Sequence, residues 1–185
     1  MSTQNATGAG SDLIEQLAIP HRRRVAVRAL LDLGFQAAPL AVKGLEHESH
    51  LVRRGCCEFL DHYMVPEALP GLIKLLDDPH PRVRLLSLHA LACERCKEGD
   101  CRPSEKDILP KAIRILKNDP SPNTRAMAIE VIGNYVHANS SAEDALVYAK
   151  SNDPSPAVRK KAGWHAPGGT IHKRTAPRPI RKTKR

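Results

Sequence analysis

Apolar side chains recur every three to four residues in a series of segments, and short polar stretches rich in Pro, Asp, Ser and Gly separate these segments. Such spacing places the apolar residues on one face of a helix, so it predicts amphipathic helices throughout and no sheet. The predicted helices cover residues 13–19, 21–33, 37–45, 50–63, 66–77, 81–93, 107–118, 122–137, 142–151 and 156–164. The pattern therefore predicts an all-α fold.

One short motif separates several of these helices. Asp78-Pro79-His80-Pro81 recurs as Asp-Pro-Ser-Pro at 119–122 and at 153–156. The first proline cannot continue a helix and pushes the residue before it out of the helical region. The second proline suits the first turn of the next helix, where Asp or Ser can cap the exposed N–H groups. The motif predicts a sharp corner between two helices.

A register of arginines indicates that the corners belong to a repeat. Similar apolar positions follow each of five arginines, at spacings of 30, 31, 41 and 34 residues. These are Arg23, Arg53, Arg84, Arg125 and Arg159. A period of this length built from two helices is typical of an α-solenoid. We expect a disordered segment at 1–10, the solenoid at 11–166 and a basic, proline-rich, disordered tail at 167–185.

The stretch LPGLIKLLDDPHPRVRLLSLHAL at 69–91 resembles the HEAT repeat family, most closely its short bacterial type, which includes phycobilisome-lyase-like repeats. The resemblance implies a right-handed α-solenoid of about five helical hairpins. It also implies a surface for interactions rather than an active site. In the family, the turn Asp and the Arg six residues later form a ladder between repeats. The matching positions are Asp78 and Arg84, Asp119 and Arg125, and Asp153 and Arg159.

The net charge of +9 is concentrated at one end of the chain. Ten of the 29 Lys and Arg residues fall in 159–185, which has no Asp or Glu, so the remaining 19 face all 20 acidic residues. Spaced cations can track a phosphate backbone or an acidic protein surface, or simply keep a tail soluble. The candidate binding residues in the tail are Lys173, Arg174, Arg178, Arg181, Lys182, Lys184 and Arg185.

The 41-residue interval contains a cluster of cysteines. His89, Cys93 and Cys96 fall at i, i+4 and i+7, on one stripe of a helix, and Cys101 can fold back across Gly99. Three thiolates and an imidazole suit a tetrahedral zinc site, which would hold the long loop in place. Two alternatives stay open: the cysteines are small buried apolar residues, or Cys93 and Cys101 form a disulfide, which a reducing compartment disfavours.

No phosphate-binding glycine loop, nucleophile elbow or pair of catalytic carboxylates stands out, and nothing indicates a small-molecule substrate. We therefore predict a non-enzymatic scaffold whose concave, second-helix face binds a macromolecule, most readily a protein. The alternatives are nucleic-acid binding through the tail and, by fold analogy only, a chromophore lyase. We expect Trp164 to cover the end of the last repeat. The polar N-terminus and the absence of a long apolar run predict a cytoplasmic protein without a membrane partner.

Overall fold

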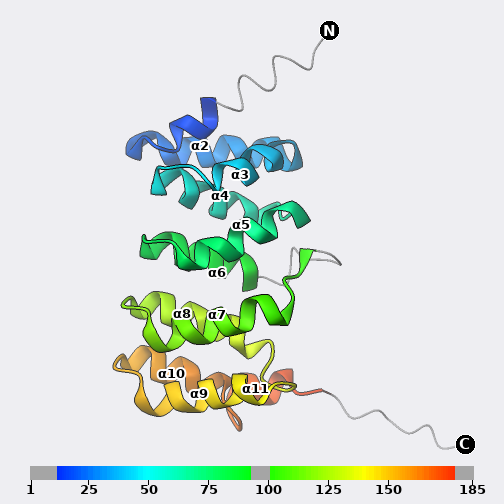
Figure 1. The fold of residues 1–185 in the computed structure, drawn as a ribbon, viewed down its shortest axis with the longest axis vertical. Helices are drawn as coiled ribbons and strands as arrows, with labels where there is room; N and C mark the ends of the chain where they lie inside the picture. Colours follow the sequence, from blue (N-terminus) through cyan, green and yellow to red (C-terminus); the bar gives the residue numbers. More distant parts are fainter. Residues whose placement is uncertain (1–11, 93–100, 178–185) are drawn as a thin grey trace, which may run out of the picture. The chain divides into compact units, whose positions relative to one another are not determined.

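The computed structural model describes residues 12–92 and 101–177, which form two compact units, one up to Ile108 and one from Leu109. Helices make up most of both units, and no strand occurs in the described residues, so the predicted all-α fold is confirmed (Figure 1). A short helical turn at 12–16 precedes the first long helix. The first unit then contains α2 (Pro20–Leu33), η1 (Gly34–Ala37), α3 (Ala38–Gly44), α4 (His50–His62), η2 (Pro66–Ala68), α5 (Leu69–Lys74), η3 (Leu75–Asp77) and α6 (Pro81–Ala92).

The second helices of successive repeats pack against one another in the first unit. Helix α4 lies between α2 and α6, while α3 packs on α4 and α5 packs on α6 (Figure 1). Phe59, Leu60, Leu72 and Leu88 are fully buried. Burying an apolar side chain of this size stabilises a fold by roughly 1.5–3 kcal/mol. The core is therefore the layer of apolar side chains between paired helices, as the periodicity predicts.

Helix α7 (Glu105–Asn118) crosses the boundary between the units, and the second unit continues with four helices. These are α8 (Pro122–Gly133), α9 (Ser140–Asn152), α10 (Pro156–His165) and α11 (Thr170–Thr175). Helix α10 packs against α8, α9 and α11. The prediction that the chain is disordered from residue 167 is therefore wrong for α11, which is helical at Thr170–Thr175. The tail positions 178–185, like the N-terminal segment 1–11, lie outside the described residues.

The stretch Pro20–Gly44 is long and apolar enough to cross a membrane by length and composition alone. In the structure it comprises α2, η1 and α3, and Gly34, with a φ of 60°, ends α2. A positive φ is costly for residues with a Cβ and interrupts a regular helix. Both α2 and α3 pack against α4, so the apolar content of this stretch is that of two helices in a repeat.

Candidate protein-binding surface

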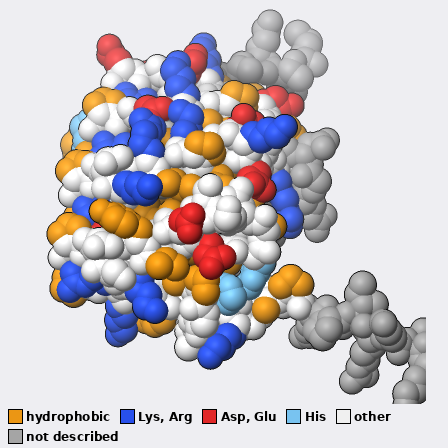
Figure 2. Space-filling view, turned by 60° about the horizontal axis from the view of Figure 1, so that its bottom comes forward, with side chains coloured by type: hydrophobic (Ala, Val, Ile, Leu, Met, Phe, Trp, Pro, Cys, Tyr) orange, Lys and Arg blue, Asp and Glu red, His pale blue; other side chains and the backbone are white. Residues whose placement is uncertain are grey.

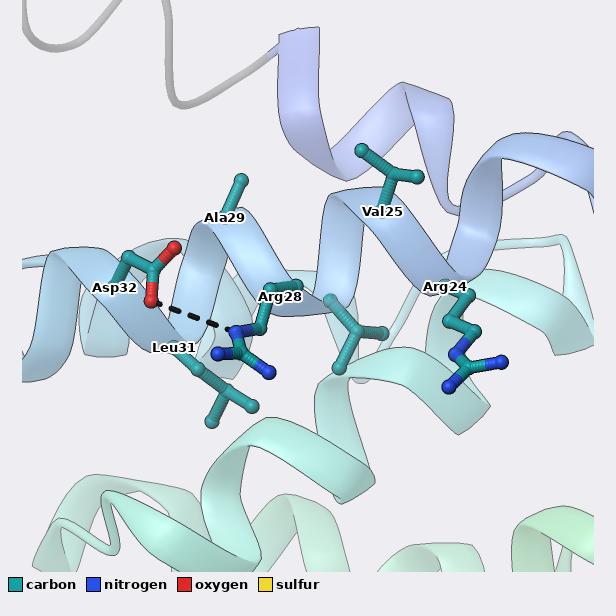
Figure 3. A pocket seen from close by; sticks show the side chains of 7 residues that line it. Arg24, Val25, Arg28, Ala29, Leu31 and Asp32 are labelled. Carbon is teal, nitrogen blue, oxygen red and sulfur yellow. Dashed lines mark ion pairs between the residues drawn. The ribbon is translucent and has the colours of Figure 1, made fainter.

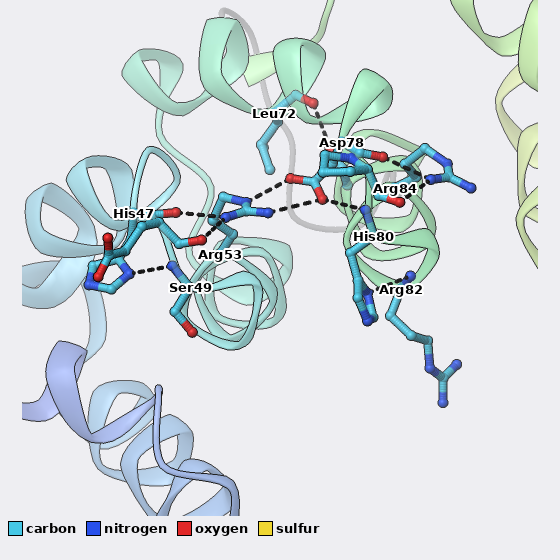
Figure 4. A network of polar contacts seen from close by, with 11 residues as sticks. His47, Ser49, Arg53, Leu72, Asp78, His80, Arg82 and Arg84 are labelled. Atoms are coloured by element: carbon cyan, nitrogen blue, oxygen red, sulfur yellow. Dashed lines mark hydrogen bonds and ion pairs between the residues drawn. The ribbon is translucent and has the colours of Figure 1, made fainter.

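The corners between helices are held by arginines that bind two corners at once. In the first unit, Arg53 Nε and Nη2 donate to the two carboxylate oxygens of Asp78, at 2.6 and 3.1 Å. Its Nη1 donates to the backbone carbonyls of His47 and Glu48, both at 2.7 Å (Figure 4). The guanidinium thus joins the carbonyls of its own corner to the carboxylate of the next corner. Such a bidentate pair fixes orientation as well as charge.

The second unit repeats this arrangement at Arg125. Its Nε and Nη2 donate to the Asp153 carboxylate at 2.8 and 2.9 Å, and its Nη1 donates to the carbonyl of Asp119 at 2.8 Å. Arg84 and Arg159 likewise donate to the carbonyls of the Asp six residues earlier, at 2.8 and 2.7 Å. Arg125 therefore meets both the carbonyl of its own corner's aspartate and the carboxylate of the following one.

The aspartates also stabilise the turns in which they lie. The carboxylates of Asp78, Asp119 and Asp153 each accept the backbone N–H two residues later, all at 2.8 Å. Burial by itself raises the pKa of the Asp153 carboxyl. The hydrogen bonds from Arg125 and from the Ser155 N–H, together with the charges of the nearby guanidinium groups, outweigh burial, and the net pKa lies below its ordinary value. Asp153 is held as a charged group.

The second repeat lacks the corner aspartate, and His47 takes its place in the turn. The Nδ1 of His47 accepts the Ser49 N–H at 2.9 Å, the same i to i+2 contact that Asp78 makes. An imidazole has no carboxylate oxygens that could bind the arginine of the preceding repeat. Arg23 accordingly pairs with Glu58, at 2.7 Å, instead of with the corner. Arg53 belongs to the predicted register of arginines but was not among the predicted ladder residues.

The same register defines an accessible surface in each unit, which we call the second-helix face of that unit. It consists of the side chains one and five residues after the register arginines: Arg54, Glu58, Leu85 and His89 on α4 and α6 of the first unit, and Ala126, Glu130, Lys160 and Trp164 on α8 and α10 of the second. These positions are half-buried or exposed. In the first unit the face is charged, with Arg54 and Glu58 3.4 Å apart. The Nδ1 of His89 lies 3.1 Å from a carboxylate oxygen of Asp61.

In the second unit this face combines an aromatic ring with charges. The side chain of Trp164 is 41% exposed, and the Nζ of Lys160 lies 5.6 Å from the centre of its ring. The expectation that Trp164 covers the end of the last repeat is therefore not met. Glu130 pairs with Lys161 at 2.7 Å. Figure 2 shows basic side chains spread among apolar ones on the face it presents, with fewer acidic side chains. Exposed aromatic side chains such as Trp164 are enriched in protein interfaces.

The predicted zinc residues are only partly within the described structure. His89 is paired with Asp61, and the thiol of Cys101 donates to the carbonyl of Met64, with sulfur and oxygen 3.8 Å apart. Both contacts lie at the end of α4. Cys93 and Cys96 lie outside the described residues, and no group of three or more His, Cys, Asp or Glu within the described ranges is placed to hold a metal ion. The zinc site stays a prediction.

The predicted binding residues of the tail divide in a similar way. Lys173 and Arg174 are exposed on α11, whereas Arg178, Arg181, Lys182, Lys184 and Arg185 lie outside the described residues. The ring of His172 lies 4.4 Å from that of His137, and the Thr175 hydroxyl is 2.9 Å from His137 Nε2. These contacts hold α11 against the rest of its unit. The role of the tail in binding stays a prediction.

Comparisons with known proteins agree on the architecture. A family model described as HEAT repeats matches residues 11–92 and 109–165. A search of curated proteins found no match. The chain is similar to a structure of the complex of CpcE and CpcF of phycocyanin lyase from Nostoc sp. PCC7120, with 22% identity and a TM-score of 0.68 over 84% of this chain and 96% of that one. At this identity the similarity concerns the fold alone.

Two designed proteins are also similar in fold. One is a designed armadillo repeat protein in complex with the peptide (KR)4, with 20% identity and a TM-score of 0.57, covering 84% of this chain and 79% of that one. The other is a computationally designed armadillo repeat protein for modular peptide recognition, with 20% identity and a TM-score of 0.55, covering 82% and 78%. Both are helical repeat solenoids, which supports the same fold for this chain.

Proposed function

The chain belongs to the HEAT repeat family, and we propose that it is a non-catalytic scaffold that binds a protein partner on its second-helix face. The observation that carries the proposal is the exposed Trp164 on that face, with Lys160 beside its ring. Tryptophan is enriched among the few residues that supply most of the binding energy of protein interfaces, because it offers a large rigid apolar area. Trp164 is the chain's one tryptophan and is exposed, so it is the best anchor for a partner.

The arrangement of the polar groups favours binding over catalysis. The carboxylates and guanidinium groups of the corners are committed to structure, where Arg53 binds Asp78 and Arg125 binds Asp153. Glu58 pairs with Arg23 on the second helix of the preceding repeat, and Glu130 pairs with Lys161 on the second helix of the following repeat. The structures named above show similar folds with a protein or a peptide bound, which supports a protein partner.

The test is a comparison of two exposed aromatic residues on different helices of the same unit. Trp164 lies on the second helix α10, and Tyr148, which is 56% exposed, lies on the first helix α9. A partner is first identified by affinity purification of the full chain with mass spectrometry, and its affinity is measured by calorimetry. Trp164→Ala is expected to weaken binding about thirtyfold, the size of a hot-spot loss of about 2 kcal/mol. Tyr148→Ala is expected to leave it unchanged.

Either of two results would reject this surface. The first is a Trp164→Ala variant that binds the partner as tightly as the original protein. The second is a loss confined to Tyr148→Ala, which would move the binding site to the first-helix layer. Thermal unfolding of each variant checks that the fold is retained.

A further inference from the structure

The outward side of α2 leaves exposed a position that is buried in the second repeat. By the arginine register, Val25 is equivalent to Gly55, and Ala29 is equivalent to Phe59. Gly55 is so close to the side chain of Leu17 that an added Cβ would lie within 2.8 Å of it, and Phe59 is fully buried. Val25, in contrast, is 68% exposed. The position that packs against Leu17 in the second repeat, at Gly55, is therefore exposed to solvent in the first repeat, at Val25.

A groove runs along this side of α2, in which a charged stripe of Arg24, Arg28 and Asp32 lies between apolar side chains. The groove has a volume of about 510 Å³, and its lining includes Val25, Ala29 and Leu31 together with Arg24 and Arg28. Figure 3 shows Val25 and Ala29 projecting away from the following helices, while the two arginines extend toward the viewer. Arg24 and Arg28 are four residues apart and so lie along the same side of the helix.

The lining of this groove carries two basic side chains, Arg24 and Arg28, and one acidic side chain, Asp32. Helix α2 contains Arg22, Arg23, Arg24 and Arg28 but a single acid, Asp32. The Arg28 and Asp32 side chains are 81% and 71% exposed and 3.8 Å apart, so water largely screens their attraction. No described residue pairs with Arg24. The groove thus presents positive charge that its own neighbourhood does not neutralise.

We propose that this groove docks an acidic amphipathic helix of another protein, which takes the place of a preceding repeat. Apolar residues of that helix would cover Val25 and Ala29. Acidic residues spaced by one turn would pair with Arg24 and Arg28, as the i, i+4 geometry allows. Positive and negative surfaces brought together in this way also speed association and select the partner.

The charges argue against two other occupants. A second copy that docked through its own α2, or through the exposed end of α11 with Lys173 and Arg174, would bring basic groups to the groove. Segment 1–11 of the chain, MSTQNATGAGS, has no Asp or Glu to pair with the arginines, and Met1 is its one large apolar residue. An acidic amphipathic helix from a different protein is the occupant that matches both the apolar side chains and the arginines of the groove.

The groove is independent of the surface around Trp164, because it lies on α2 in the first unit and Trp164 lies on α10 in the second. The probe is a fluorescein-labelled 18-residue helical peptide of Leu, Ala and Glu, with Glu at i, i+4 spacing beside a leucine stripe. A peptide with Gln in place of every Glu is its matched control. Both are titrated with the full-length chain by fluorescence anisotropy at low and at physiological salt.

We expect the acidic peptide to bind, with an affinity that falls as salt rises, and the Gln peptide to bind at least tenfold more weakly. The double variant Arg24→Ser with Arg28→Ser is expected to lose at least tenfold in affinity, and Val25→Ser several-fold. The exposed pair Arg102→Ser with Lys106→Ser changes the net charge equally and is expected to retain binding.

The same titrations can overturn the proposal. It is wrong if the acidic peptide does not bind, if the Gln peptide binds equally well, or if both double variants lose the same affinity. Concentration-dependent dimerisation in sedimentation experiments that Val25→Ser abolishes would also overturn it, because a second copy would then cover the groove. Trp164→Ala is expected to leave peptide binding intact, so failure here and failure of the Trp164 surface are distinguishable.

Discussion

Replacing Asp153 by Asn removes the charge from one rung of the ladder while leaving the turn able to form. The side chains of Arg125 and Asp153 are only 9% and 3% exposed, and two hydrogen bonds join them. An asparagine oxygen can still accept the Ser155 N–H. The neutral amide has one oxygen and no negative charge, so it cannot accept both hydrogen bonds from the Arg125 guanidinium. Arg125 is then buried without a counter-ion.

The expected loss follows from this burial. Removing one partner of a buried ion pair costs about 3–5 kcal/mol, because the remaining charge is uncompensated. Because Asn retains one acceptor oxygen, we expect a loss in the free energy of unfolding at the lower end of this range, about 3 kcal/mol. With a urea dependence of about 2 kcal/mol per molar, this lowers the unfolding midpoint by about 1.5 M.

The assay is urea unfolding followed by the fluorescence of Trp164, the chain's one tryptophan, which lies in the same unit as the ion pair. Asp144→Asn, an exposed acid on α9, is the control with the same change of charge and should shift the midpoint little. A loss below about 1 kcal/mol, or equal losses for the two variants, would refute a stabilising role for the ladder.

The pH dependence of the folding stability also tests the ion pair between Arg125 and Asp153. The pKa of the Asp153 carboxyl is lower in the folded protein than its ordinary value of 3.8. A lowered folded pKa contributes stability that is present above the unfolded pKa and is lost as the pH falls through the folded pKa. The difference in stability between the original protein and Asp153→Asn should therefore shrink as the pH falls below about 4. A difference that stayed constant down to pH 2 would contradict this assignment.

Three further outcomes test other parts of the structure. A Cβ on Gly133 would collide with the ring of His165, so Gly133→Ala should lose about 1–3 kcal/mol in urea unfolding. The helical Gly163 has room, and Gly163→Ala should instead gain about 0.5–1 kcal/mol; the opposite order would contradict the packing. Burial raises the pKa of the Cys56 thiol to about 12, so iodoacetamide at pH 8 should modify it only after unfolding, as read by mass spectrometry. If the predicted zinc site exists, purified protein should contain about one zinc per chain and Cys96→Ser should lose it; metal-free protein prepared without chelators would remove the site.

The sequence pattern was sufficient for the repeats because their signals are local. Proline, aspartate and apolar spacing specify where each corner begins, and α6 and α10 start at Pro81 and Pro156 as predicted. Helix ends were less accurate. The first helix α5 ends in the 3-10 helix η3, and α8 ends at Gly133, earlier than the predicted residue 137.

Features that depend on contacts between distant residues could not be predicted in this way. Helix α11 has six residues and little apolar periodicity of its own, and it forms where it packs on α10 and its Thr175 meets His137. Isolated helices of this length are unstable, so only the tertiary contact specifies it. The exposure of Trp164 and the open groove on α2 likewise depend on which repeats have neighbours. The register could have indicated the groove, since Val25 occupies a position that is buried in the next repeat.

The most direct test of the second-helix face as the binding surface is amide hydrogen exchange of the full chain with and without its identified partner. Exchange reports on protection segment by segment, so the two helices of one repeat can be compared within a single experiment. We predict slower exchange in α10, at Pro156–His165, when the partner is bound, with α9, at Ser140–Asn152, unchanged. Protection confined to α9, with none in α10, would contradict binding on this face.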